Sequence, residues 1–260
     1  MTGANSSESE PGTGRQLPPR RRFLVPAVII VVVALLIAAV LWLRPGGEQG
    51  GGDTVSTAGS SVDVSDLPPP SEVAVPDLSD AESRDPEDLL ADGPVDAPVV
   101  LVVFTDYQCP YCARWTHDTL PALQDYVERG ELRIEWRDVN VYGEDSVRAA
   151  RAALAAAMQG RHADYQQALF DGGEIRSSSQ LSGEALIELA DDLGLDPVQF
   201  AEDMQSEQVG STIVDNAARG IELGAMTTPS FVIGGTPSVG AQPTEVFTDQ
   251  IDEALEEADA

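Results

Sequence analysis

The chain has 260 residues, 42% of them hydrophobic, enough for one folded domain with length left for a tail or an anchor. It carries 15 basic and 44 acidic side chains, a formal net charge of −29. This excess of negative charge excludes nucleic acid as an expected ligand, because a phosphate backbone would be repelled.

The run Phe23–Leu43 is uncharged and 21 residues long, about the length of a helix that crosses the hydrocarbon core of a bilayer. Four arginines precede it and only Arg44 follows closely, so the positive-inside rule keeps residues 1–22 in the cytoplasm. A cleaved signal peptide is the alternative, but no small-x-small cleavage site follows the run. We therefore predict a single-pass cell-membrane protein whose C-terminal part is extracytoplasmic.

Residues 44–95 are rich in Gly, Ser, Pro and Asp and contain no aromatic residue. This composition is typical of a flexible linker, because it offers too little apolar surface for a core. We predict an extracytoplasmic stem over this segment and a folded domain over residues 96–258.

The predicted domain opens with a strand, a helix and a second strand. Residues 99–104 are continuously apolar and mostly β-branched, which indicates a central strand buried on both faces of an α/β sheet. A helix is expected over residues 110–129, with a kink at Pro121. In residues 132–137 apolar and charged side chains alternate, which predicts a strand with one face less buried than the other.

A helical insertion at about 144–224 follows. Its predicted helices span residues 146–159, 163–171, 183–193 and 197–224, the last one broken near Gly210. A short strand at 230–233 and a final helix at 243–257 complete the domain.

The only two cysteines form the motif Cys109-Pro110-Tyr111-Cys112, directly after the first strand and at the start of the next helix. Unpaired N–H groups and the helix dipole favour a thiolate at such a position. The placement therefore predicts a redox dithiol.

Two other roles for the cysteine pair are less favoured. A structural disulfide between residues so close in sequence would remove little chain entropy. A zinc site would need further ligands, and His117 and His162 do not form the close histidine pair of a zinc finger. No metal is expected.

Three segments together resemble the DsbA-like thiol-disulfide oxidoreductases. They are Phe-Thr-Asp-Tyr-Gln-Cys-Pro-Tyr-Cys at 104–112, Thr-Pro-Ser-Phe-Val-Ile-Gly-Gly at 228–235 and Gly-Ala-Gln-Pro at 240–243. The resemblance covers about residues 96–258. It implies an α/β, thioredoxin-like fold with a helical insertion, here preceded by the transmembrane helix and the disordered stem.

The resemblance also assigns roles to residues. It implies that Cys109 is the exposed attacking cysteine, Cys112 its buried partner and Pro229 a cis-proline beside them. The cis bond would turn the Thr228 backbone toward the disulfide, where an extended substrate could pair with it. Pro110 and Tyr111 would support the site, but this dipeptide lacks the histidine of the strongest oxidants in the family.

Asp106 lies three residues before Cys109 and has two possible roles. Its carboxylate could accept or relay the proton of Cys112, since a carboxylate near a buried thiol can act as a base. It could equally form the turn that leads into the helix.

These observations predict an extracytoplasmic enzyme that oxidises cysteine pairs in exported proteins through a redox-active disulfide, with no other cofactor. By resemblance, a membrane partner would reoxidise it. Alternatives are a disulfide reductase or isomerase, for example one acting on haem-attachment cysteines, a thioredoxin-like module that carries a metal, and an interaction domain with a vestigial disulfide.

Overall fold

The computed structural model describes residues 75–260. The predictions for the N-terminal tail, the transmembrane helix at 23–43 and the stem up to residue 74 lie outside the described residues. Among residues 75–260, no helix combines the length and the apolar character that crossing a membrane requires.

A five-stranded mixed sheet organises the domain, with the order β1-β3-β2-β4-β5. The central pair β2 and β3 is parallel, whereas β1, β4 and β5 each run antiparallel to their neighbours. The strands are β1 (Ala91–Asp92), β2 (Val99–Thr105), β3 (Leu132–Asp138), β4 (Ser230–Ile233) and β5 (Thr236–Val239). The helices are η4 (Ser79–Ala81), α2 (Pro110–Asp118), α3 (Leu120–Glu128), α4 (Glu144–Met158), α5 (His162–Leu169), η5 (Asp171–Gly173), α6 (Gly183–Asp192), α7 (Pro197–Gln205), α8 (Glu207–Glu222) and α9 (Thr244–Ala258).

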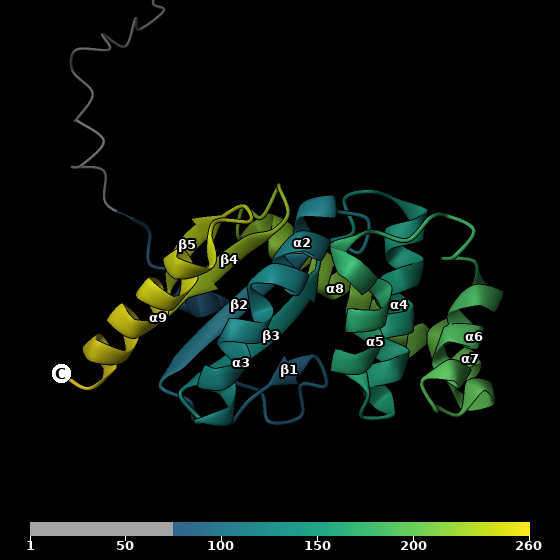
Figure 1. Cartoon of the computed structure of the whole chain (residues 1–260), viewed down its shortest axis with the longest axis horizontal. Helices are drawn as coiled ribbons and strands as arrows, with labels where there is room; N and C mark the ends of the chain where they lie inside the picture. The colour runs from purple at the N-terminus through teal and green to yellow at the C-terminus, as the bar shows by residue number, and fades with distance from the viewer. Residues whose placement is uncertain (1–74) are drawn as a thin grey trace, which may run out of the picture. The chain divides into compact units, whose positions relative to one another are not determined.

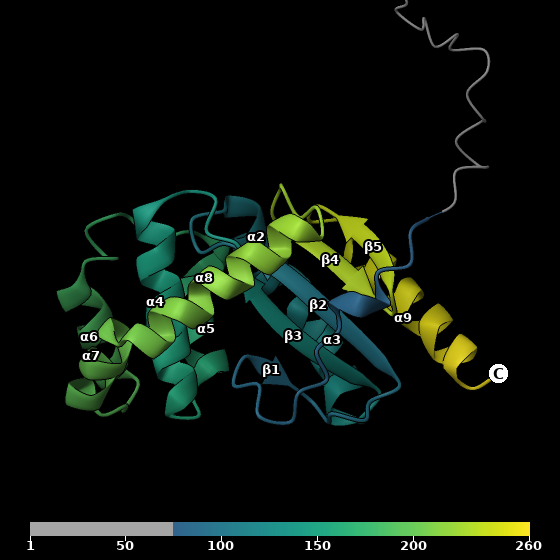
Figure 2. The same cartoon turned by 180° about the vertical axis from the view of Figure 1, so that it is seen from behind.

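The sheet is covered on both faces. Helices α2, α3 and α9 lie on the face seen in Figure 1, and α8 crosses the opposite face in Figure 2. Helices α4 to α7 stand beside the sheet, and with α8 they form the insertion between β3 and β4 that the sequence predicted at 144–224.

Helix α8 approaches the sheet closely at Gly220. A Cβ atom at this position would collide with the side chain of Val139 and would lie 3.2 Å from the ring of Phe104. Glycine therefore lets the helix pack on the end of β2 without displacing core side chains.

The structure corrects two helix predictions. The kinked helix expected at 110–129 is instead two helices that meet at Thr119, because Pro121 lies in the first turn of α3 and has no N–H to continue α2. The break expected near Gly210 lies at Ser206, which is extended and whose hydroxyl accepts from the N–H of Val209 to cap α8.

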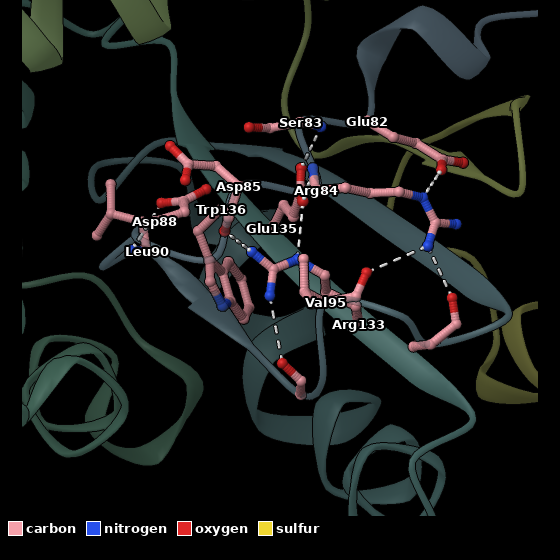
Figure 3. Close-up of polar contacts among 12 residues, drawn as sticks. Glu82, Ser83, Arg84, Asp85, Asp88, Leu90, Val95, Arg133, Glu135 and Trp136 are labelled. Carbon is pink, nitrogen blue, oxygen red and sulfur yellow. Dashed lines mark hydrogen bonds and ion pairs between the residues drawn. The ribbon is translucent and has the colours of Figure 1, made fainter.

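Strand β3 was expected to have a less buried face, and this prediction is wrong. All seven of its residues are buried, including Arg133, Glu135 and Arg137. The reason is that residues 79–92, predicted to belong to the flexible stem, pack over this face (Figure 3). The ordered domain therefore begins before residue 96.

Glu135 is the centre of this buried polar cluster. Its carboxylate accepts from the N–H groups of Ser83 and Arg84, both at 2.8 Å, and from the guanidinium groups of Arg133 at 2.9 Å and Arg137 at 3.1 Å. Burial alone would raise the pKa of Glu135, but these four donors outweigh it and lower the pKa below its ordinary value. The cluster fastens the N-terminal segment to the sheet as an ionised network.

Candidate active site

The cysteine motif lies where β2 gives way to α2. Cys109 caps the helix in an extended conformation, with φ −92° and ψ 114°, and Pro110 occupies the first helical position. The N–H of Cys109 donates to the Asp106 carbonyl at 3.0 Å, and its carbonyl accepts from Ala113 at 3.1 Å. The free N–H groups of the first turn consequently lie next to the Cys109 sulfur.

The predicted cis-proline loop lies beside the motif. The peptide bond between Thr228 and Pro229 is cis. The Sγ of Cys109 donates to the carbonyl oxygen of Thr228 at 3.2 Å, which brings the loop before β4 against the start of α2. Two segments that are distant in the sequence thus form one site.

The two cysteines are free thiols with opposite acidities. A hydrogen bond from the Cys112 thiol is the largest cause that lowers the pKa of Cys109, which falls to about 6. Burial opposes this shift, while the N–H groups of Cys112 and Tyr111 add to it. Burial, reinforced by Cys109, raises the pKa of Cys112 well above its ordinary value. At neutral pH the negative charge therefore belongs on Cys109.

The expectation of an exposed Cys109 is wrong for this structure. The exposed fraction of Cys109 is 0% and that of Cys112 is 1%, whereas Tyr111 between them is 57% exposed. The Thr228 carbonyl contacts the Cys109 sulfur directly. An incoming sulfur therefore has to displace neighbouring atoms before it reaches Cys109.

Asp106 takes part in the turn and does not hold the proton of Cys112. Its Oδ1 accepts from the N–H of Gln108 at 2.7 Å and from the hydroxyl of Ser146 at 2.6 Å, and its Oδ2 accepts from the N–H of Tyr142 at 3.2 Å. Both carboxylate oxygens are thus engaged by donors other than Cys112. Of the two roles considered for this residue, the geometry favours the turn-forming one.

Asp138 is a titratable residue of the site that the sequence analysis missed. It is 1% exposed, its Oδ1 has no hydrogen-bond partner, and burial raises its pKa to about 8. It is paired in register with Thr105, the last residue of β2, so it lies one strand away from the segment that leads into the dithiol. The sequence did contain a signal for this residue. Asp138 is an acidic residue at the end of a strand, and that strand lies beside the one that leads into the cysteine motif.

Tyr142 was also missed. It lies in the loop between β3 and α4, is 54% exposed, and has a raised pKa whose largest cause is the charge of Cys109. Tyr142 is far from the cysteine motif in the sequence, so no sequence pattern indicated that it is a neighbour of Cys109 in the fold.

Among residues 75–260 there is no group of three His, Cys, Asp or Glu side chains arranged to hold a metal ion.

Comparison with known families agrees with this geometry. The family model described as "Thioredoxin" matches residues 87–253, a segment that contains both cysteines and the cis-proline. The chain belongs to the thioredoxin family. The match also begins before residue 96, within the segment that the structure places over β3.

Two curated relatives show different contexts for such a domain. The probable disulfide bond formation protein D of Bacillus anthracis is 24% identical over 148 residues, which cover 55% of this chain and 68% of the relative. The Na(+)/H(+) antiporter NhaA of Herminiimonas arsenicoxydans is 30% identical over 164 residues, 63% of this chain. The match spans only 25% of that antiporter's length.

Solved structures share the fold. A thioredoxin-like oxidoreductase from Silicibacter pomeroyi is 30% identical, with a TM-score of 0.54 over 66% of this chain and 99% of that one. The alpha-DsbA1 of Wolbachia pipientis is 19% identical, with a TM-score of 0.60 over 67% and 94%. The predictions of a thioredoxin-like fold with a helical insertion and of a thiol-disulfide oxidoreductase are confirmed.

Proposed function

We propose that this domain oxidises cysteine pairs in exported proteins, outside the cytoplasm, by donating the disulfide between Cys109 and Cys112. The observation that carries the proposal is the position of Cys109 at the start of α2 and against the cis-proline loop, where its pKa is lowered to about 6. Stabilising the thiolate stabilises the reduced dithiol, and a stable reduced form makes the corresponding disulfide a stronger oxidant.

The reaction follows two displacements. A substrate thiolate attacks the Cys109 sulfur of the disulfide, forms a mixed disulfide and releases Cys112, which takes up a proton because of its high pKa. A second substrate thiolate then attacks the substrate sulfur of the mixed disulfide. The electron pair of the broken bond stays on Cys109, which leaves as a thiolate, and the substrate gains its disulfide. A low pKa makes Cys109 a good leaving group in this last step.

The surroundings of the dithiol suit an unfolded chain as substrate. Exposed apolar side chains lie on three segments that flank the site, represented by Tyr111, Val141 and Met226. Met226 is two residues before Thr228, whose backbone is proposed to pair with an extended peptide. Backbone pairing and apolar contacts would accept many sequences.

Localisation and reoxidation complete the proposal. The uncharged run at 23–43 and the arginines before it support a membrane anchor with the domain on the extracytoplasmic side. A membrane partner would accept the electrons left on the dithiol and restore the disulfide.

The test compares wild type with Cys109→Ala in refolding of reduced ribonuclease and in reduction of insulin. We expect the wild type to oxidise ribonuclease and Cys109→Ala to lose this activity completely, and a Cys112→Ser variant to accumulate mixed disulfides with exported proteins. Insulin reduction without ribonuclease oxidation would instead assign a reductase. Activity that survives without Cys109 would refute the dithiol mechanism.

A further inference from the structure

Buried polar atoms without hydrogen-bond partners gather between β3 and α5. Among residues 75–260, no protein group pairs with Asp138 Oδ1, Gln166 Nε2 or either ring nitrogen of His162. These residues are 1%, 2% and 7% exposed. A buried donor or acceptor that stays unpaired costs about 1–3 kcal/mol, so several in one place indicate that internal water satisfies them.

Two neighbouring elements bring these side chains together. The ring of His162, the first residue of α5, lies with its centroid 6.1 Å from that of Trp136 in β3. Gln166 follows one helical turn later, about 6 Å along α5. Asp138 follows Trp136 by two residues on the same face of β3, about 7 Å along the strand. Nearly equal steps in the same sense place Gln166 opposite Asp138.

A further contact shows that α5 and β3 do run in the same sense. The ring of Phe170, one turn after Gln166, stacks on that of Tyr107 with the centroids 5.2 Å apart. Tyr107 lies two residues beyond Thr105, the partner of Asp138 in register. Helix α5 therefore reaches the end of the sheet at which Asp138 lies.

Tyr107 adds a hydroxyl to this group. It is 2% exposed, and its hydroxyl has no partner among residues 75–260. Burial raises the pKa of Tyr107 well above its ordinary value, and the charge of Asp138 adds to this shift while the side chain of Gln166 opposes it, in agreement with their placement. The phenol keeps its proton at neutral pH, so it passes one proton on only as it accepts another.

One end of the group lies beside the dithiol. Tyr107 belongs to the same core cluster as Cys112 and Phe170. Thr116, one turn after Cys112 in α2, lines a cavity together with Phe170, and its own hydroxyl is buried without a partner among the described residues. Polar atoms that can bind water thus continue to the helix that carries the buried cysteine.

The other end lies near the edge of the sheet. Trp136, the neighbour of His162, donates from its Nε1 to Asp92 Oδ2 at 3.2 Å, and Asp92 lies half-buried in the edge strand β1. Burial lowers the pKa of His162, although the charges of Asp92 and Asp88 oppose the shift. The neutral ring then offers one donor and one acceptor to water.

We propose that ordered water fills the space between α5 and β3 and carries the proton of the buried cysteine, Cys112, to solvent. The residues that line this route are Tyr107, Asp138, Gln166 and His162. The inference rests on the dithiol exchange of the proposed function, but not on its direction or its location.

The route acts when Cys112 resolves a mixed disulfide on Cys109. The proton of Cys112 passes through the Tyr107 hydroxyl to ionised Asp138. The Cys112 thiolate attacks the Cys109 sulfur, a bond forms between the two cysteines, and the other sulfur of the mixed disulfide leaves as a thiolate. Asp138 then releases the proton to the water chain. Gln166 and His162 are positioning residues, because they hold this water and do not touch the sulfur atoms.

The direct test is Gln166→Met, which keeps the length of the side chain and removes its polar atoms. The reduced full chain, purified in detergent, is mixed with oxidised glutathione, and the mixed disulfide is followed by rapid acid quenching and mass spectrometry. Attack by Cys109 forms this species, and attack by Cys112 removes it. We expect the second step to slow by about tenfold, less than the roughly 10²–10⁴-fold that a positioned base itself contributes. The first step and the equilibrium constant with glutathione should not change, because a proton route acts equally on both directions.

The matched control is Gln167→Met, the same substitution at an exposed position of the same helix. It should react like wild type in both steps. His162→Phe, at the other end of the route, should slow the second step as Gln166→Met does, and it serves for the measurement if Gln166→Met does not fold. A second step that keeps its wild-type rate in these variants overturns the proposal. So does an equal slowing of both steps, because that result would indicate a general structural effect.

The glutathione reaction involves no protein substrate, so its result is independent of the ribonuclease assay. A selective slowing of the second step supports the route even if the protein proves to be a reductase. A wild-type rate in the variants removes the route and leaves the proposed oxidase function untouched.

Discussion

Strand β3 carries two buried polar regions of opposite character, one on each face of the sheet. Glu135 faces the N-terminal segment, and its carboxylate is satisfied by four donors, of which Ser83, Arg84 and Arg133 are labelled in Figure 3. Side chains alternate between the two faces of a strand, and Asp138 is separated from Glu135 by an odd number of positions, so it lies on the opposite face, the one that carries the dithiol. Its Oδ1 has no hydrogen-bond partner. The pKa of Glu135 is lowered, so it stays ionised, whereas the pKa of Asp138 is raised to about 8, so it gains and loses its proton near neutral pH.

This difference separates structural from chemical use of a buried carboxyl group. A network in which each charge is paired resists titration and fixes the position of a segment. A desolvated carboxyl with a pKa of about 8 changes its charge near neutral pH, close to a dithiol that exchanges protons during each cycle. The following variants test whether the two faces behave independently.

Removing the centre of the paired network should have the largest effect on stability. Glu135→Ala leaves Arg133 and Arg137 buried with one carboxylate lost, and breaking a buried ion pair in this way costs about 3–5 kcal/mol. Denaturant unfolding should report this loss, while the pKa of Cys109 stays as in wild type. If Glu135→Ala does not fold, the milder Glu135→Gln serves for the same measurement.

The control for this variant is Glu131→Ala, which breaks the solvent-exposed pair with Arg129. Exposed pairs contribute little, so it should unfold nearly as wild type does. Equal losses in the two variants would mean that burial does not set the importance of the Glu135 network, and a shifted pKa of Cys109 in Glu135→Ala would mean that the two faces are coupled.

The sequence predicted the chemistry better than the packing, for a physical reason. The spacing of Cys109 and Cys112, the strand before them and the sequence around Pro229 are local patterns that fix local geometry. The partners of Glu135 come from a segment with the composition of a linker, and nothing within β3 shows that this segment returns to cover it. The one signal in the sequence for a buried ion-pair network was the position of Glu135 between Arg133 and Arg137 in a strand.

Other differences have the same origin. Strand β5 was not predicted, although Gly234-Gly235 between two short runs is typical of a hairpin turn. The placement of Tyr142 beside Cys109 depends on Asp106, a contact between residues that are far apart in sequence. Periodicity finds elements, but it does not say which loops they bring together.

Asp138→Asn tests the titratable face. The folded pKa of about 8 lies above the unfolded value of about 4, so the folded state binds the proton more tightly. Stability supplied by protonated Asp138 is therefore complete below the unfolded pKa and is lost as pH rises toward about 8, at roughly 1 kcal/mol per pH unit. Asparagine should remove this dependence of stability on pH and make the variant more stable than wild type at the upper end of the pH range.

The measurement is the difference in unfolding free energy between Asp138→Asn and wild type at about pH 5 and about pH 8, which cancels all other titrating groups. The control Asp249→Asn, at an exposed position of α9, should have the same unfolding free energy as wild type at both pH values. If the difference in unfolding free energy does not change with pH, Asp138 is ionised throughout this range. It would then behave like Glu135, and the contrast between the two carboxyl groups would be wrong.

Ser146→Ala is the smallest change and tests whether the Asp106 carboxylate is a structural or a chemical group. The buried hydroxyl donates to Asp106 Oδ1 at 2.6 Å, and its loss should cost about 1–2 kcal/mol in denaturant unfolding. The N–H groups of Gln108 and Tyr142 still hold the carboxylate, so the pKa of Cys109 should stay unchanged. The control Ser211→Ala, on the surface of α8, should alter neither quantity. If the pKa of Cys109 shifts in Ser146→Ala, Asp106 has a chemical role, because the loss of one donor to its carboxylate would then change the acidity of the Cys109 thiol.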